Sequence, residues 1–291
     1  MGRSIHFILN PNAGSGSAAS AGKSLSAYCK ENGYQAVLHT TTHAGHATTL
    51  AAKLRNGNDP VVAIGGDGTV REVAAGLIGG AAPLGIIPCG SGNGLARHLG
   101  IPMNPLSAFR SIMNGRVVNA DVIYAGEQPF LNIAGLGFDG LIAHEFNAHG
   151  KRGLINYIRL IIRHYFRSSE FKYELNSEEF NQTGMAFIIA LANGSQYGNN
   201  AWIASGAALD DGLMDVIIVR KPTLTAIPLF LWQVMTGRVN RSRLVNRQQV
   251  REVRIKLMKS IPLHLDGEAA GHAADITFTV SSESLKLMVP A

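Results

Sequence analysis

The chain has 291 residues, 46% of them hydrophobic, which is enough for two domains with cores of their own. Two cysteines exclude a disulfide-dense secreted scaffold, and we expect both thiols to be reduced. The net charge of +6 suits nucleic acid, nucleotide phosphates or an anionic membrane surface. Aromatic residues make up only 7% and no basic block stands out, so no nucleic-acid partner is expected.

No segment has the pattern of a secretion signal or a membrane span. The N-terminus lacks an apolar signal core. The most apolar stretch, from Leu224 to Met235, is too short to cross a bilayer and contains Pro228 and Gln233. We therefore expect a soluble, cytoplasmic protein.

Strand and helix patterns alternate through the first part of the chain. Short apolar runs predict strands at 5–9, 36–41, 60–64 and 83–87. Helical patterns follow the first three strands and end near residues 32, 56 and 78. Such alternation predicts an α/β domain with a mostly parallel sheet. We place this domain at residues 1–120, with residues 281–291 available to pack back on it.

Short β-like runs dominate after about residue 121. They lie at 130–134, 185–192, 214–219, 250–257 and 276–280. One helix is predicted among them, Leu154 to Arg167, with Arg159, Arg163 and Arg167 on one face. That helix either packs on its domain or docks on anionic lipid. The pattern predicts a second, β-rich, sandwich-like domain at residues 121–280.

Glycine-rich or polar loops follow three of the four predicted strands of the first domain. In parallel sheets, ligands bind beyond the carboxyl ends of the strands. The loops after the strands at 5–9, 60–64 and 83–87 are therefore expected to meet in one crevice.

The loop after the third strand is the strongest phosphate-binding candidate. Its residues are Gly65, Gly66, Asp67, Gly68 and Thr69, and a helix follows them. Glycines let backbone N–H groups approach phosphate oxygens, and a helix start adds positive partial charge. Asp67 fits there as a ligand of a nucleotide-bound Mg²⁺. The alternative is a tight turn with Asp at a helix start.

Two other glycine patterns fail as nucleotide motifs. A Walker A loop in the first thirty residues would need glycine where Ser17 stands, so a P-loop NTPase is rejected. In the segment Gly90–Gly94 the third glycine comes too early for a dinucleotide fingerprint.

Six motifs in order along the chain resemble those of the diacylglycerol kinase catalytic-domain family, which includes sphingosine kinases and soluble bacterial lipid kinases. The matching segments are 10–14, 65–69, 90–93, Asn132 with 135–139, 209–215 and 265–268. The resemblance covers nearly the whole chain. One departure from the family pattern is Gly94, which stands where many bacterial members carry Asp. In those members the Asp takes part in a network of water and magnesium, and Asp121 is the remaining candidate for that network here.

The resemblance implies roles for individual residues of the nucleotide site. Residues 65–69 would hold the nucleotide phosphates, with Asp67 also taking part in catalysis. The further nucleotide contacts that it implies are Asn10, Thr41, Glu72, Ser91 and Asn93.

The resemblance also implies roles in the second domain. Glu268 of the Asp266-Gly267-Glu268 motif would be the general base, although that motif is also an ordinary hairpin turn. The Asp211 carboxylate with the carbonyls of Ala208 and Leu213 would hold a structural Mg²⁺, or form only a turn. Asp139 would either meet the lipid head group or cap a helix.

We therefore expect an ATP- and Mg²⁺-dependent lipid kinase that phosphorylates a hydroxyl of a diacylglycerol or a sphingoid base. ATP is expected between the two domains, and the enzyme at the membrane periphery; a homodimer is left open. The alternatives are an NAD kinase, which shares the Gly-Gly-Asp-Gly-Thr loop, and a non-catalytic protein that binds lipid or nucleotide. The Asn-Pro-x-x-Gly start at Asn10 and the acidic motif at Glu268 argue against NAD kinase.

Overall fold

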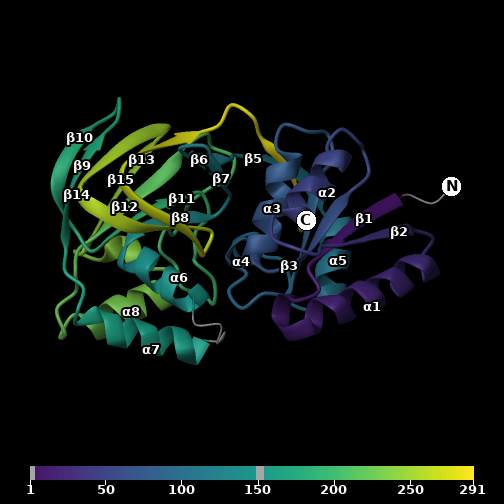
Figure 1. The fold of residues 1–291 in the computed structure, drawn as a ribbon, viewed down its shortest axis with the longest axis horizontal. Coiled ribbons are helices and arrows are strands. Elements are labelled where there is room, and N and C mark those ends of the chain that lie inside the picture. The colour runs from purple at the N-terminus through teal and green to yellow at the C-terminus, as the bar shows by residue number, and fades with distance from the viewer. Residues whose placement is uncertain (1–3, 149–153) are drawn as a thin grey trace. The chain divides into compact units, whose positions relative to one another are not determined.

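The computed structural model describes residues 4–148 and 154–291 (Figure 1). The chain divides into two compact units, which we describe separately. The first unit comprises Met1–Val122 and Ser282–Ala291, and the second comprises Ile123–Ser281.

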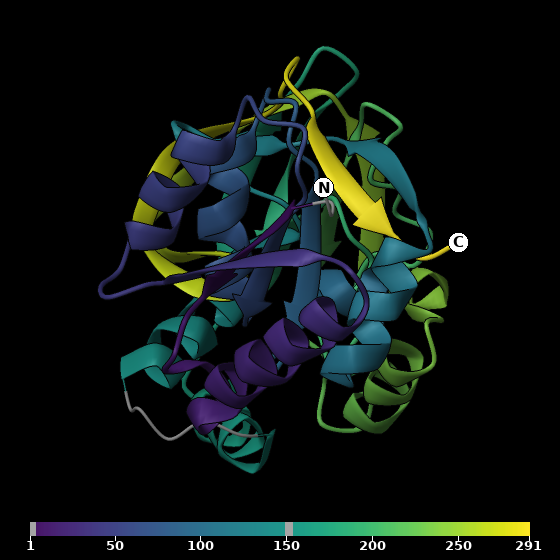
Figure 2. The same ribbon diagram turned by 90° about the vertical axis from the view of Figure 1, so that its right-hand side faces the viewer.

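The first unit is built on a sheet with the strand order β2-β1-β3-β4-β16-β5. Its parallel strands are β1 (Ser4–Leu9), β2 (Gln35–Thr40), β3 (Val61–Gly65), β4 (Leu84–Pro88) and β16 (Leu285–Val289). Strand β5 (Arg116–Ala120) pairs antiparallel with β16 and ends the sheet (Figure 2). Strands β3 and β4 are buried along their whole length, which explains their continuous apolar sequences.

Helices cover both faces of this sheet. Helices α1 (Ser17–Glu31) and α5 (Pro105–Met113) lie on one face, and α2 (His46–Leu54) and α3 (Asp67–Leu77) on the other (Figure 2). The start of α5 is capped by the Asn104 side chain, whose oxygen accepts from the Ser107 N–H at 3.0 Å. A 3₁₀ helix, η1 (Ala13–Gly16), and the short helix α4 (Gly94–His98) complete the unit. The α/β prediction is confirmed; the helices α4 and α5 and the strands β5 and β16 were not predicted.

The second unit is built on an antiparallel sheet with the order β13-β12-β11-β8-β14-β15-β6-β7, to which β9 and β10 are added through β14. Its first strands are β6 (Ile123–Ala125), β7 (Gln128–Phe130), β8 (Ile133–Gly137), β9 (Phe171–Asn176) and β10 (Asn181–Ala186). Its later strands are β11 (Ile188–Ala192), β12 (Met214–Val219), β13 (Val245–Val250), β14 (Glu252–Leu265) and β15 (Glu268–Val280). The β-rich prediction is confirmed.

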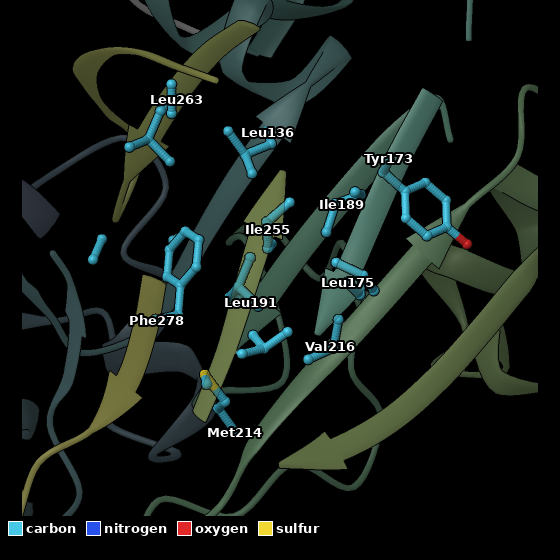
Figure 3. Close-up of a cluster of buried hydrophobic side chains, with 14 of the residues drawn as sticks. Leu136, Tyr173, Leu175, Ile189, Leu191, Met214, Val216, Ile255, Leu263 and Phe278 are labelled. Atoms are coloured by element: carbon cyan, nitrogen blue, oxygen red, sulfur yellow. The ribbon is translucent and has the colours of Figure 1, made fainter. Parts of the chain in front are cut away.

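The core of the second unit is aliphatic and aromatic (Figure 3). Side chains from strands distant in sequence converge there, among them Leu136 of β8, Leu191 of β11 and Phe278 of β15. The ring of Phe278 packs edge-on against Phe130 at 6.3 Å between centroids. Burial of such large side chains supplies most of the driving force for folding of this unit.

The prediction of a single helix in the second part was wrong. The unit contains α6 (Phe138–Ala148), α7 (Leu154–Tyr165), α8 (Ile227–Met235) and the 3₁₀ helix η2 (Val239–Arg241). Helix α6 begins inside a glycine-rich motif, and every residue of α8 except Gln233 is apolar, so neither has the periodicity that identifies a helix.

Two further observations bear on the sequence expectations. Cys29 and Cys89 are both free thiols, and both are buried. Within the described part of the chain, no helix has the length and apolar character needed to cross a bilayer.

Candidate active site

Three loops meet at the carboxyl edge of the first unit's sheet because β1, β3 and β4 are parallel neighbours. The Asn10 N–H donates to the Ile64 carbonyl at 3.2 Å, and the Cys89 N–H donates to the Gly65 carbonyl at 2.8 Å. The predicted convergence of the loops after these strands therefore occurs in the fold.

The loops approach one another so closely that side chains are excluded. A Cβ at Gly90 would lie 2.6 Å from Gly66 Cα, and a Cβ at Gly14 would lie 2.2 Å from the Cys89 carbonyl oxygen. Gly14 also has a φ of +59°, which disfavours any other residue. The surface at this edge is thus backbone, which is the kind of surface that phosphate groups approach.

Helix α3 starts at this surface. Its N-cap is Gly66, which has no side chain to accept from the first N–H groups, and Asp67, Gly68 and Thr69 form the first turn. The first N–H groups of a helix lack intrahelical partners, and with the helix dipole they favour an anion. The residues present therefore fit the phosphates of a nucleotide, and the Asp67 carboxylate fits a cation bound to them.

The predicted nucleotide contacts Asn10 and Thr69 touch each other. Asn10 Nδ2 donates to Thr69 Oγ1 at 3.3 Å, which links the end of β1 to the first turn of α3. Thr41 lies just after β2, buried, with its N–H donating to the Leu9 carbonyl at 2.8 Å. These residues belong to one edge of one sheet, although their contacts with a nucleotide remain predictions.

Asn93 stabilises the third loop. It is buried with a φ of +51°, and its side-chain amide both accepts from the Gly90 N–H at 2.8 Å and donates to the Gly90 carbonyl at 2.9 Å. Ser91 lies between them and is exposed. The geometry makes Asn93 a support of the loop and leaves Ser91 as the side chain accessible to a ligand.

Glu72 supports a helix start within the same unit. Its Oε2 accepts from the Ala47 N–H in the first turn of α2 at 3.2 Å, and its carbonyl accepts from the Thr48 hydroxyl at 2.9 Å. Any contact of Glu72 with a nucleotide remains a prediction.

The predicted base lies on the hairpin between β14 and β15. Asp266 and Gly267 have φ values of +51° and +82°, as the two central residues of a type I′ turn require, and Glu268 opposes Leu265 as the first residue of β15. The Asp266 carboxylate accepts from three successive N–H groups, those of 131, 132 and 133, at 2.9 to 3.1 Å. Glu268, half-buried, is therefore presented by a turn that is fixed at its base.

A buried polar group underlies this hairpin. The Asp139 carboxylate accepts from the Gly140 N–H and the Tyr197 hydroxyl, both at 2.8 Å, and lies 3.3 Å from His264 Nε2. Asp139 lies in the first turn of α6, in agreement with the alternative that it caps a helix. Its contact with a lipid head group remains a prediction. His264 and Tyr197 were not predicted; the available signal was a histidine within the apolar run of β14.

The predicted structural magnesium site lies in the turn before β12. Asp211 is exposed, and its Oδ1 accepts from the Leu213 N–H at 3.0 Å, while Gly212 has a φ of +73°. Residues 4–148 and 154–291 hold no cluster of three or more His, Cys, Asp or Glu side chains that could bind a metal. One carboxylate with the carbonyls of Ala208 and Leu213 fits Mg²⁺ only with several waters, and this site remains a prediction.

Two family models match the chain. The model of the diacylglycerol kinase catalytic domain matches residues 4–125, and that of the YegS C-terminal NAD kinase beta sandwich-like domain matches residues 132–289. The chain belongs to the diacylglycerol kinase family of lipid kinases. The two matches together account for nearly all of this lipid kinase.

Similar proteins of known name agree with this assignment. "Probable lipid kinase YegS-like" of Pseudomonas putida is 30% identical over 267 residues, which cover 90% of this kinase and 88% of the relative. A "Diacylglycerol kinase" of Bacillus subtilis is 30% identical over 251 residues, covering 83% of this kinase and 82% of the relative.

Solved structures share the fold. A diacylglycerol kinase of Bacillus anthracis has a TM-score of 0.74 at 21% identity and covers 99% of this kinase and 96% of that chain. An NAD kinase of Archaeoglobus fulgidus in complex with ATP has a TM-score of 0.53 at 12% identity, over 99% of this kinase and 94% of that chain. The fold of this lipid kinase is thus nearer to the diacylglycerol kinase than to the NAD kinase.

Proposed function

We propose that this lipid kinase transfers the γ-phosphate of ATP to a hydroxyl of a diacylglycerol. The observation that carries the proposal is the backbone surface where the loops of β1, β3 and β4 meet at the start of α3. The Bacillus subtilis relative is named a diacylglycerol kinase, which supports that acceptor; sphingoid bases are the second class to be tested.

The first turn of α3 would hold the β- and γ-phosphates of ATP through its N–H groups. The loops at Gly66 and Gly90 would let phosphate oxygens approach the backbone, because neither residue has a side chain. Asp67 would ligate Mg²⁺, which when bound neutralises charge on the phosphates. Phosphoryl transfer depends mainly on positioning and charge neutralisation, and this surface would provide the positioning.

Glu268 would accept the proton of the lipid hydroxyl. As that proton moves to the carboxylate, the hydroxyl oxygen bonds to the γ-phosphorus, the bond from phosphorus to the β,γ-bridging oxygen breaks, and ADP leaves. A carboxylate at the start of β15, on a turn held by Asp266, is restrained in position, as a general base requires.

The test is a transfer assay with labelled ATP and Mg²⁺. Dioleoylglycerol and sphingosine in mixed micelles, and NAD in solution, are offered as acceptors to the full chain. We expect label in phosphatidic acid and none in NADP. Labelled NADP, or no labelled lipid with any acceptor, would contradict the proposal.

The matched inactive control is Asp67→Ala, which should abolish transfer while circular dichroism and melting temperature stay close to wild type. Near-normal transfer by a folded Asp67→Ala protein would show that Asp67 is not part of the site.

Because the acceptor is a membrane lipid, we also propose contact with the bilayer through α7 and the two residues after it. Arg159, Arg163 and Arg167 are exposed, as are the apolar side chains of Ile162 and Phe166. Transfer from vesicles should therefore rise with anionic lipid and fall with salt, which screens charges beyond about 8 Å at physiological ionic strength.

A further inference from the structure

In helix α8 the usual division between buried apolar and exposed polar side chains is reversed: its polar side chain is buried and several apolar side chains are exposed. Its only polar side chain, Gln233, is buried at 9% exposure. Leu229, Leu231, Trp232 and Met235 are each between 48% and 58% exposed. A helix on the surface of a globular protein normally turns polar residues to solvent. An apolar group of this kind marks a surface that is covered by something else.

One side of α8 is nonetheless packed on its own unit. Phe230 and Val234 pack against the buried cluster that includes Ile217 and Val219 of β12. The Val234 carbonyl accepts from the Trp202 N–H at 3.0 Å. The helix is therefore held in place by one face, and its apolar exposure is part of the folded structure.

The chain segment that contains α8 is basic. Residues 216–251 contain seven Lys and Arg and no Asp or Glu, although Arg220 pairs with Glu170 and Arg247 with Asp215. The Arg238 guanidinium lies 5.0 Å from the centre of the Trp232 ring, in direct contact with the apolar face. Arg241 of η2, which packs on α8, and Arg243 are exposed. Apolar side chains rimmed by cations fit an anionic lipid surface.

We infer that α8 and the arginines after it, Arg238, Arg241 and Arg243, form a surface that docks on an anionic bilayer. Nine residues cannot span a membrane, so the helix lies in the interface with Leu231 and Trp232 among the acyl chains. A second copy of the chain is a poorer occupant, because a symmetric contact would bring these arginines against their own counterparts. The need for docking rests on the proposed function, since a kinase that acts on diacylglycerol must reach a membrane.

The test measures vesicle binding, so its readout does not depend on kinase activity. Sedimentation of the full chain is compared with phosphatidylcholine vesicles and with vesicles that also contain phosphatidylglycerol. We expect binding to the anionic vesicles, and a loss of tenfold or more in the double variant Leu231→Gln/Trp232→Gln. The matched control is Met258→Gln, which removes a side chain that is 79% exposed on β14 and should bind as wild type.

A second variant pair separates local charge from net charge. Arg238→Gln/Arg241→Gln/Arg243→Gln should lose tenfold or more in binding at physiological salt. Lys172→Gln/Lys256→Gln/Lys259→Gln removes the same charge from exposed positions of β9 and β14 and should lose less than threefold. Equal losses in the two triple variants would overturn the assignment of the surface to α8.

Two further outcomes would also overturn it. One is wild-type binding that the Leu231→Gln/Trp232→Gln change leaves intact. The other is a wild-type dimer, seen by light scattering, that this change dissociates, because α8 would then be a subunit contact. Failure of the proposed function is a separate result. If the chain binds anionic vesicles but phosphorylates no lipid in micelles, the docking surface is supported and the proposed kinase function is contradicted.

Discussion

His264 Nε2 lies 3.3 Å from the Asp139 carboxylate, and the two side chains are only 4% and 7% exposed. His264 Nδ1 in turn accepts from the Gly267 N–H at 3.3 Å. In a neutral ring this leaves the proton on Nε2, where it points to Asp139. One imidazole thus connects α6 to the turn that carries Glu268, through residues 125 positions apart in the chain.

We expect His264→Ala to weaken both stability and catalysis. The change removes one partner of the buried Asp139 carboxylate and the side-chain acceptor of the Gly267 N–H, at a cost of about 1–3 kcal/mol in the free energy of unfolding. A looser turn should lower kcat with little change in the KM for ATP. Denaturant unfolding and steady-state kinetics measure both effects. The control is His272→Ala, an exposed histidine of β15, which should change neither.

Gly90→Ala should lower ATP affinity at least tenfold. Its new methyl group would lie 2.6 Å from Gly66 Cα and 2.8 Å from Asn93 Oδ1, so the loops must move apart, at a cost of about 1–3 kcal/mol. Titration calorimetry with a non-hydrolysable ATP analogue measures the affinity. Gly57→Ala is the control because its nearest atom would be 3.3 Å away, on a turn far along the chain from the loops. Unchanged affinity in Gly90→Ala would argue against nucleotide binding at this edge.

Glu268→Gln should lower kcat by about 10²–10⁴-fold, because the amide keeps the shape and cannot accept the proton. The KM for ATP should change little. Glu252→Gln, an exposed glutamate on β14 of the same hairpin, serves as the control and should keep its activity. If Glu268→Gln keeps kcat within tenfold, about 1.4 kcal/mol of barrier, the proton goes elsewhere and Asp67 becomes the leading candidate.

Asp211→Ala tests the structural magnesium site. An ion bound only by the folded state stabilises that state, so added Mg²⁺ should raise the melting temperature of the wild type more than that of the variant. The variant should also melt lower and turn over more slowly. Asp210→Ala changes the exposed neighbour and should respond to Mg²⁺ as wild type. An equal rise in melting temperature in all three proteins would show that Asp211 does not bind a stabilising Mg²⁺.

Arg247→Leu should destabilise the second unit in a pH-dependent way. Arg247 binds the buried Asp215 carboxylate through two bonds of 2.7 and 2.8 Å. Burial raises the pKa of Asp215, and the guanidinium opposes that rise. Without the arginine, a lone buried carboxylate should cost about 3–5 kcal/mol at pH 8.

The loss relative to wild type should shrink toward pH 5. With its folded-state pKa raised further, Asp215 binds a proton in the folded state that the unfolded chain lacks, so stability rises as pH falls. Urea unfolding at the two pH values measures this. Arg254→Leu is the control, since its partner Asp275 is exposed and the pair contributes little. A loss that is the same at both pH values would contradict the role assigned to burial.

The sequence by itself determined the α/β and β-rich classes, most strands of the first unit and the glycine loops, because each depends on residues close together in the chain. A buried strand such as β3 is a run of apolar residues, and the glycine-rich start of α3 is encoded by a few consecutive residues. The family resemblance also lay in these short motifs, and the matching family models confirm it.

Only the tertiary structure decided which distant residues meet and which faces remain exposed. His264, Tyr197 and Asp139 come together across long separations, and no local pattern encodes such a contact. Every residue of helix α8 except Gln233 is apolar, and the sequence alone would place that polar side chain in solvent, whereas in the fold Gln233 is buried and Trp232 faces outward. The pairing of β16 with β4 and β5 likewise depends on which sheet edge is open once the rest of the unit has folded. Burial and long-range contacts are properties of the packed chain, and short sequence patterns do not contain them.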